Sequence, residues 1–162
     1  MDIPRWESCL REVVVMNRTR NILIFILGFL GIGALFGGGA LTISPSGAWL
    51  RMPLSLLEKS PFNNYLIPGI ILFLILGVAP IGLIFALIKK PAGKFAEKLN
   101  FFRDMHWSWS YTIYVAFALI IWLQVEMQII QAVAWIHTFY MFFAIALIFV
   151  ALLPQVRHLY KK

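Results

Sequence analysis

Charged residues are scarce in this chain. Asp, Glu, Lys and Arg together make up 13% of its 162 residues, about half the share found in an ordinary soluble domain. Hydrophobic residues make up 61%, which is more apolar surface than a soluble domain of this length can bury. The composition therefore excludes an ordinary soluble protein. It predicts a single transmembrane domain, residues 1–162, with lipid covering much of its surface.

Cysteine and catalytic motifs are also nearly absent. The single thiol, Cys9, excludes an intramolecular disulfide, and its predicted cytoplasmic location favours an unmodified thiol over palmitoylation. No G-x-S-x-G, C-x-x-C, H-E-x-x-H or P-loop motif occurs. His106 and His158 are expected at the inner side and His137 at the outer side, which disfavours a metal site or a bis-histidine haem. We therefore expect no cofactor and no metal.

The chain does contain four long apolar runs. Each is close to the ~20 residues that a helix needs to cross the hydrocarbon core of a bilayer. The turn between the third and fourth runs is very short, so these two helices are expected to be antiparallel neighbours. The sequence predicts an all-α fold, a left-handed four-helix transmembrane bundle. The predicted spans are 21–43, 65–88, 107–130 and 135–153.

Lys and Arg are distributed unequally between the segments that join these runs. The N-terminal segment 1–20, the segment 89–106 and the C-terminal tail contain twelve of them, whereas the loop 44–64 contains two. By the positive-inside rule, this asymmetry predicts cytoplasmic N- and C-termini, a basic cytoplasmic loop at 89–106 and an outer loop at 44–64. Attraction to anionic lipid also explains the net charge of +7, so no nucleic-acid partner is expected.

Three shorter helices are expected outside the spans. The stretch Ile3–Met16 is compatible with a helix lying on the membrane surface, and equally with a frayed tail. The apolar centre of the outer loop predicts a short interfacial helix between spans one and two, with Pro53 in its first turn. In the basic loop, a surface helix is expected at Lys94–Phe102, with Phe95, Leu99 and Phe102 turned inward.

Small residues and one proline indicate how the spans pack. Gly33 and Gly37 form a G-x-x-x-G pair in span one, a spacing that lets two helix backbones approach closely. A contact with another span of the same chain is favoured over a dimer contact. Pro80 lies inside span two, where it removes one backbone hydrogen bond and is expected to kink the helix. We expect that kink to serve packing rather than gating.

Glu126 is the only acidic residue in the apolar part of any predicted span. A helix that starts at Trp107 on the inner side rises about 28 Å before it reaches Glu126. The carboxylate is therefore expected near the outer interface, where a charge costs less than at mid-membrane. Trp122 shares the helix face of Glu126, whereas Gln124, Gln128 and Gln131 share a roughly opposite face.

Two interpretations of Glu126 remain open. In the functional one, Glu126, His137 and Arg51 form a polar pocket under the outer loop, where a carboxylate beside an imidazole can move protons or bind a cationic headgroup. In the structural one, Glu126 pairs with Arg51 or Lys59 and pins the loop to the bundle. The structural one is favoured, because buried charges usually need partners. The candidate ligand-binding residues are Glu126, His137, Arg51, Gln128, Gln131 and Trp122.

Two short stretches carry a family resemblance. They are the segment from Ser60-Pro61-Phe62 to Tyr65-Leu66-Ile67-Pro68-Gly69, and Trp107-Ser108-Trp109 followed by Ile121-Trp122. Together they resemble a family of small, uncharacterised bacterial four-span integral membrane proteins, over about residues 22–160. The resemblance implies this fold and a place in the bacterial inner membrane. It carries no activity, because fold analogy alone does not license a function.

Three classes of function are compatible with these features. The first is a non-catalytic accessory or scaffold component of a membrane complex, whose partners are lipids, other membrane proteins or further copies of the chain. The second is a binder of, or an enzyme acting on, a lipid or other apolar ligand at the outer leaflet through Glu126 and His137. The third is a small transporter or channel, which is disfavoured because no charge lies at mid-membrane and no inverted repeat is visible. The sequence favours them in this order.

Overall fold

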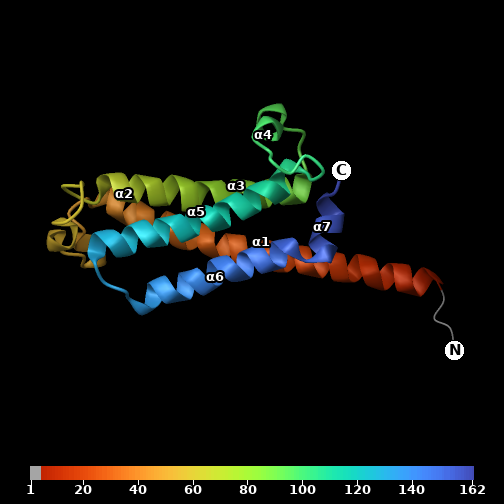
Figure 1. Cartoon of the computed structure of the whole chain (residues 1–162), viewed down its shortest axis with the longest axis horizontal. Helices are drawn as coiled ribbons and strands as arrows, with labels where there is room; N and C mark the ends of the chain where they lie inside the picture. Colours follow the sequence, from red (N-terminus) through yellow and green to blue (C-terminus); the bar gives the residue numbers. More distant parts are fainter. Residues whose placement is uncertain (1–4) are drawn as a thin grey trace.

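The computed structural model describes residues 5–162, and within them every regular segment is helical (Figure 1). Four helical stretches are long and apolar enough to cross a membrane, which confirms an all-α class with four such helices. They lie side by side along the long axis of the molecule. They are Arg11–Ile43 within α1, Leu66–Lys89 (α2 Leu66–Ile71, η3 Leu72–Val78 and α3 Ala79–Lys89), α5 Trp107–Ile130, and α6 Trp135–Leu152.

The first helix, α1, runs without a break from Arg5 to Ile43. Its 39 residues correspond to about 58 Å, whereas the hydrocarbon core of a bilayer is about 30 Å thick. No Gly or Pro occurs between Arg5 and Leu27, so nothing in this stretch interrupts the helix. From Arg5 onward, the N-terminal segment is therefore neither a separate surface helix nor a frayed tail. Ile3 and the side chain of Cys9 lie outside the described part of the chain.

Close backbone contact holds α1 against span two. A Cβ atom added at Gly38 would lie 2.6 Å from the backbone nitrogen of Phe73 and 2.8 Å from the carbonyl oxygen of Gly69. Farther along, a Cβ at Gly77 would lie 2.9 Å from the Leu35 side chain, so the two helices run antiparallel. Contact within the chain is thus observed, but its tightest point is Gly38.

The predicted pair, Gly33 and Gly37, occupies a more open place. A Cβ at Gly33 would come 3.2 Å from the Tyr140 hydroxyl of α6, and one at Gly37 would meet only Leu72 at 3.7 Å. The G-x-x-x-G spacing identified a small-residue helix correctly. It could not tell which side of that helix faces span two, because α1 carries six glycines on several faces.

Span two changes its hydrogen-bond register just before Pro80. The segment η3 is a π-helix, and at its end the N–H of Ala79 donates to the carbonyl of Leu74. Proline has no N–H, and its ring crowds the carbonyl four residues earlier. The wider π-turn accommodates that conflict within a continuous helix. A bend at Pro80 stays a prediction.

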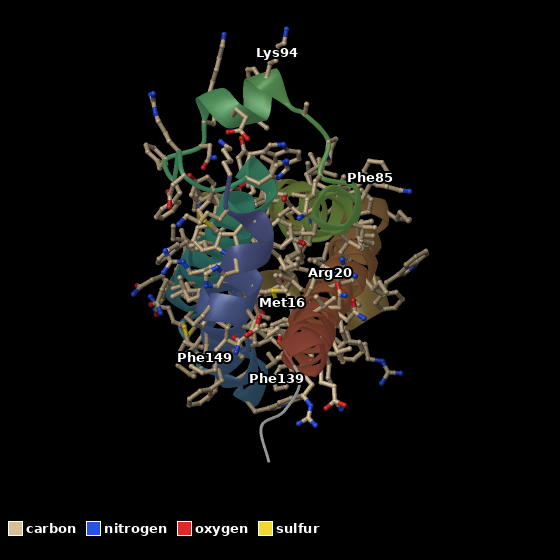
Figure 2. All side chains as sticks on the ribbon, turned by 90° about the vertical axis from the view of Figure 1, so that its right-hand side faces the viewer. Met16, Arg20, Phe85, Lys94, Phe139 and Phe149 are labelled. Carbon is tan, nitrogen blue, oxygen red and sulfur yellow. The ribbon has the colours of Figure 1, made fainter. Side chains whose placement is uncertain are left out.

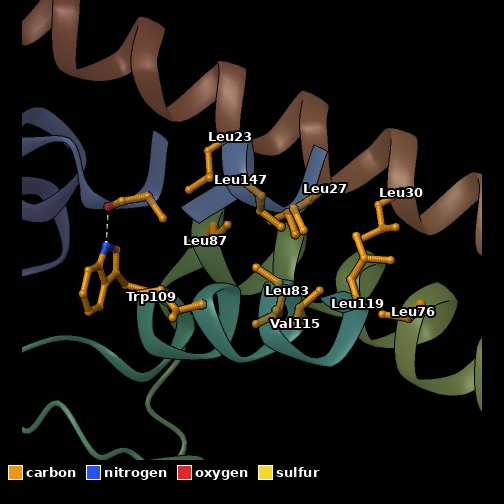
Figure 3. Close-up of a cluster of buried hydrophobic side chains, with 14 of the residues drawn as sticks. Leu23, Leu27, Leu30, Leu76, Leu83, Leu87, Trp109, Val115, Leu119 and Leu147 are labelled. Atoms are coloured by element: carbon orange, nitrogen blue, oxygen red, sulfur yellow. Dashed lines mark hydrogen bonds between the residues drawn. The ribbon is translucent and has the colours of Figure 1, made fainter. Parts of the chain in front are cut away.

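The core of the bundle is built mainly from leucine side chains supplied by all four spans (Figure 3). Leu23, Leu27 and Leu147 are fully buried in the half nearer the C-terminus, which is called the inner half after the predicted orientation; the half nearer the loop 44–64 is called the outer half. Trp109 is buried in the inner half as well, and its Nε1–H donates to the Ala151 carbonyl across the α5–α6 interface at 2.8 Å. This bond satisfies the indole N–H without water, as burial in a membrane protein requires.

The outer surface of the bundle is apolar. Phe85, Phe139 and Phe149 point away from the helix axes at the periphery (Figure 2). All three side chains are exposed in the isolated chain. Exposed aromatic rings on three sides of a four-helix bundle are typical of contact with lipid, not water.

The C-terminal tail closes the inner end of the bundle. After α6, the helix α7 (Pro154–Tyr160) buries Tyr160, whose hydroxyl donates to the Leu87 carbonyl at 2.7 Å. Lys161 forms an isolated antiparallel bridge with Met105, and Lys162 donates to Glu97 at 2.6 Å. Segments far apart in sequence, the basic loop and the C-terminus, are thereby tied together.

The helix of the basic loop, α4, is shorter than predicted and spans Lys94–Lys98. Phe102 was expected to turn inward, and its ring lies 5.4 Å from that of the buried Trp109 although it stays 41% exposed. For Phe95 and Leu99 the same expectation is wrong. Their exposed fractions are 76% and 54%, because α4 projects sideways from the bundle near Lys94 (Figure 2). Rings exposed at this level are suited to the membrane interface.

The outer loop contains two 3-10 turns, η1 (Ala48–Leu50) and η2 (Leu54–Leu57), with no α-helix between them. Pro53 precedes η2 in an extended conformation, as an N-cap. Tyr65 anchors the loop: it is buried, its N–H donates to the Pro45 carbonyl at 2.9 Å, and its hydroxyl donates to the Pro53 carbonyl at 2.8 Å. The loop is therefore fixed over the outer ends of the helices.

We predict that Gly38→Ala lowers the stability of the folded protein by roughly 1–3 kcal/mol, because the added methyl group meets rigid backbone atoms of span two. The matched control is Gly82→Ala, since a Cβ there meets nothing within 4 Å. Thermal unfolding in nonionic detergent measures both. Equal midpoints for the two variants would contradict the close contact.

The inner-end pair of Glu97 and Lys162 makes a pH-dependent prediction. Desolvation raises the pKa of Glu97, but hydrogen bonds from Lys162, Asn100 and the Trp107 N–H outweigh it and hold the pKa below its ordinary value. The pair therefore stabilises the docked tail above the ordinary glutamate pKa of about 4.3, and this stabilisation is lost as the pH falls through the lowered value.

Glu97→Gln should accordingly speed amide hydrogen exchange in α7 and the last residues at neutral pH, and remove the acid dependence seen in the wild type. The exposed pair contributes at most about 1 kcal/mol. Asp104→Asn is the control, because the hydrogen bond between Asp104 and the tail runs from the Lys162 N–H to the backbone carbonyl of Asp104, which the substitution keeps. Unchanged exchange in the Glu97 variant would show that the pair does not hold the tail.

Candidate functional site

A cavity of about 190 Å³ lies between α1, η3, α5 and α6 in the outer half of the bundle. Most of its wall is apolar. The N-terminal end of α6, which carries two of its lining residues, Ile136 and His137, diverges from the other helices (Figure 1). Its polar side chains are a carboxylate, an imidazole, an indole and a phenol. The lining residues are Leu30, Gly33, Ala34, Gly37, Leu72, Leu76, Leu119, Trp122, Leu123, Glu126, Ile136, His137 and Tyr140.

Helical spacing brings the polar residues together. Trp122 and Glu126 are four residues apart on α5, and His137 and Tyr140 are three apart on α6, so each pair projects from one face of its helix. On the opposite wall, Gly33 lets α1 approach without filling the space. The polar faces of α5 and α6 therefore lie opposite the glycines of α1, whose lack of side chains leaves the cavity open.

Glu126 and His137 are close but not hydrogen-bonded. The Glu126 Oε2 lies 3.9 Å from the His137 Nε2. The His137 Nδ1 accepts the backbone N–H of Ala134 at 3.0 Å, so a neutral ring carries its proton on Nε2, facing the carboxylate. His137 is also in the first turn of α6, where the helix end contributes positive partial charge. These groups place partial positive charge near Glu126, but neither of them neutralises a carboxylate.

A second, smaller cavity of about 100 Å³ lies directly under the outer loop. It shares Leu72, Trp122 and Glu126 with the first, so these three residues stand at the boundary between the two spaces. The rest of its wall is almost wholly apolar. That wall comprises Leu41, Met52, Leu57, Phe62, Tyr65, Pro68, Ile71, Val125, Ile129 and Ile130.

The structure does not bring the other predicted site residues to this place. Arg51 is exposed at the outside of the loop, in a left-handed conformation with φ of 54°. Gln128 is exposed and lines a separate shallow groove beside Phe62. Gln131 ends α5 and accepts a hydrogen bond from Lys59. None of them is among the residues that line either cavity.

The expected pairing of Glu126 with Arg51 or Lys59 is therefore wrong. Lys59 is engaged by Gln131, and the ion-pair contact that the described residues give Glu126 is the one with His137. The physical reason is the course of the loop. The 3-10 turns place apolar residues such as Met52 and Leu57 over the carboxylate and leave the cations outside.

The three histidines have separate surroundings. The His106 Nδ1 and the Ser108 hydroxyl are 2.8 Å apart at the start of α5, whereas His158 is exposed on α7. Burial lowers the pKa of His106, which favours its neutral form. No group of three or more His, Cys, Asp or Glu side chains suited to a metal ion occurs in the described part of the chain.

Tyr140 is the site residue that the sequence did not single out. It lies three residues after His137, on the same helix face, and this spacing alone would have nominated it. Leu72 was not predicted as a site residue either, since nothing in an apolar run distinguishes a side chain that lines both cavities from its neighbours.

If Glu126 does not pin the outer loop through an ion pair, its charge does not contribute to the free energy of unfolding. We predict that Glu126→Gln keeps or raises the unfolding temperature in detergent, because it removes a partly buried charge that has no cationic partner. His137→Ala should instead cost about 1 kcal/mol, because the Ala134 N–H loses its acceptor at the start of α6. A marked loss of stability in the Glu126 variant would restore the structural interpretation.

The chain was compared with known proteins at three levels. No family model matches it, and no curated protein or solved structure matches it either. The resemblance to small four-span membrane proteins therefore rests on the quoted residues alone. The four apolar helices are compatible with a small multi-pass integral membrane protein.

Proposed function

We propose that this chain is a small integral membrane protein that binds an amphiphilic molecule from the outer leaflet. The observation that carries the proposal is Glu126, a carboxylate in a cavity with mostly apolar walls, whose ion-pair contact among the described residues is His137, 3.9 Å away and beyond hydrogen-bond range. A ligand that is partly apolar and partly polar would satisfy both kinds of wall. This ranks ligand binding above the scaffold role that the sequence favoured.

The size of the cavity supports a small ligand or one end of a larger one. Sites for drug-sized molecules commonly occupy about 300–1,000 Å³, and this cavity is near 190 Å³. A whole phospholipid does not fit, whereas a headgroup or a short amphiphile does. No Ser, Thr, Cys or Lys is among the described residues that line the cavity, and Glu126 lies 3.9 Å from His137, beyond hydrogen-bond range, so no nucleophile is paired with a base there and binding is favoured over catalysis.

The proposed orientation is N- and C-termini in the cytoplasm. The Lys and Arg asymmetry supports it, as does the arrangement of the segments: α4, α7 and the start of α1 lie at one end and the outer loop at the other (Figure 1). In this orientation the cavity opens toward the outer leaflet, or the periplasmic leaflet if the cell is bacterial.

The orientation predicts which single cysteines an impermeant thiol reagent reaches in intact cells. In a Cys9→Ala background, Ser55→Cys should react before lysis, whereas Lys98→Cys should react only afterwards, because both side chains are exposed but at opposite ends. Labelling is read by mass. The reverse pattern would move the cavity to the inner leaflet.

The binding proposal predicts that filling the cavity removes the bound molecule. Gly37 lines the cavity with only Leu72 near it, so Gly37→Leu has room to fold and occupies the space. Gly82→Leu, on an open helix face, is the control. Native mass spectrometry of gently purified protein should show a small bound molecule in the wild type and the control, and none in Gly37→Leu. An empty wild-type protein would contradict the proposal.

The scaffold role is the second candidate, and one observation favours it. Val13, Val14 and Val15 are exposed in the N-terminal half of α1, whose N-terminal end extends past the other helices (Figure 1). A partner helix would cover them. The same mass spectra separate the candidates, because a scaffold retains a protein partner or a second copy and remains indifferent to Gly37→Leu.

A further inference from the structure

The chemical class of the ligand follows from the charge at the boundary between the two cavities. Glu126 lines both of them, and neither wall contains a Lys or Arg. The side chain is 30% exposed, so the carboxylate reaches the cavity space. A carboxylate in apolar surroundings is costly unless a cation meets it.

His137 does not supply that cation. Its side chain is 6% exposed, and its Nδ1 is occupied by the Ala134 N–H, which requires that nitrogen to be unprotonated. A second proton on the ring would break this cap at the start of α6. The neutral ring presents one N–H to the carboxylate from 3.9 Å, beyond hydrogen-bond range, so the carboxylate keeps its capacity for a bound cation.

Aromatic rings complete a site for a cation. Trp122 and Tyr140 line the same cavity as Glu126, from two different helices. The faces of such rings attract ammonium groups, and the attraction strengthens where water is excluded. An anion would meet the like charge of Glu126, and a neutral group would leave that charge uncompensated.

The smaller cavity supplies a place for an apolar chain. It adjoins the first cavity, with which it shares the lining residues Leu72, Trp122 and Glu126, and its wall under the loop includes Met52 and Leu57. Flexible Met and Leu side chains adapt to alkyl chains. The larger cavity therefore offers polar contacts and the smaller one an apolar space, and the Glu126 carboxylate lies at the boundary between them.

We infer that the site binds an amphiphilic amine, with its ammonium group against Glu126, Trp122 and Tyr140 and its alkyl chain under the outer loop. This inference rests on the proposed function and names the class of its ligand. It predicts selectivity for positive charge over a neutral or negative headgroup on the same chain. It also predicts that the alkyl chain of the ligand contributes to affinity, since an ammonium group alone leaves the space under the loop empty.

The experiment compares probes that share one chain. Purified protein in nonionic detergent is titrated with n-octylammonium, n-octanol and n-octanoate, and with methylammonium as the chainless probe. Binding is followed by the shift of the thermal unfolding midpoint, which rises with ligand concentration when the folded state binds. Glu126→Gln is the test variant, and Glu58→Gln, an exposed carboxylate on the same outer loop, is its matched control.

The wild type and Glu58→Gln should bind octylammonium at least roughly tenfold more tightly than octanol, and octanoate and methylammonium most weakly. Glu126→Gln should lose that preference while still binding octanol. Trp122→Leu should weaken octylammonium roughly two- to fivefold and octanol less, which gives a second readout if Glu126→Gln does not fold.

Other results distinguish a failure of the amine inference from a failure of ligand binding itself. If octanol binds as well as octylammonium and Gly37→Leu abolishes both, the amine inference is overturned while ligand binding stands. If no probe shows saturable binding to the wild type, or if Gly37→Leu binds all probes normally, the cavity is not a ligand site and both fail. Octylammonium binding that survives Glu126→Gln unchanged also overturns the inference.

Discussion

The structure depends on the backbone contact between α1 and span two at Gly38 and Gly69. Lipid tails are as apolar as the helices, so burial of apolar surface does not drive the helices together and close packing must do so. A Cβ at either glycine would collide with the opposite helix, so the approach is possible only with bare backbone. This contact fixes the rotation of α1, which turns Gly33 toward Tyr140 of α6 and Gly37 toward Leu72 of span two, and both glycines line the cavity.

The two ends of the bundle satisfy their polar groups differently. At the inner end, Glu97 accepts from Lys162 and Asn100, and the Trp107 indole donates to the Pro91 carbonyl. At the outer end, the ion-pair contact that the described residues give Glu126 is His137, 3.9 Å away. The loop 44–64 contains two cations, Arg51 and Lys59, either of which could in principle pair with Glu126. That these cations stay outside is why we assign the outer end to ligand binding.

Patterns within one helix were read correctly from the sequence. The four apolar runs follow from length and composition, and the shared face of Trp122 and Glu126 follows from helical spacing. His137 was placed with Glu126 because a short turn makes α5 and α6 neighbours and sets both residues at the same depth. These inferences need only the geometry of a helix and the thickness of a bilayer.

The predictions that were wrong concern the rotation of a helix about its axis, irregular loop backbone and the start of a helix. The position of Arg51 is set by left-handed residues at Gly47 and Arg51 itself, and no periodic pattern encodes such a loop. The choice of Gly38 over Gly33 depends on how α1 rotates against its neighbour, which the spacing of small residues leaves open. The N-terminal segment continued the helix because no residue stops it, whereas its charge had suggested a boundary.

The most direct measurement is an experimental structure of the protein extracted with its surrounding lipid, at a resolution that defines side chains and bound molecules at the outer end. We expect density for a small molecule between Trp122 and Tyr140, with a positively charged group beside Glu126 and an extension under the outer loop. A closed cavity, or a Lys59 or Arg51 side chain bonded to the Glu126 carboxylate, would contradict the assignment.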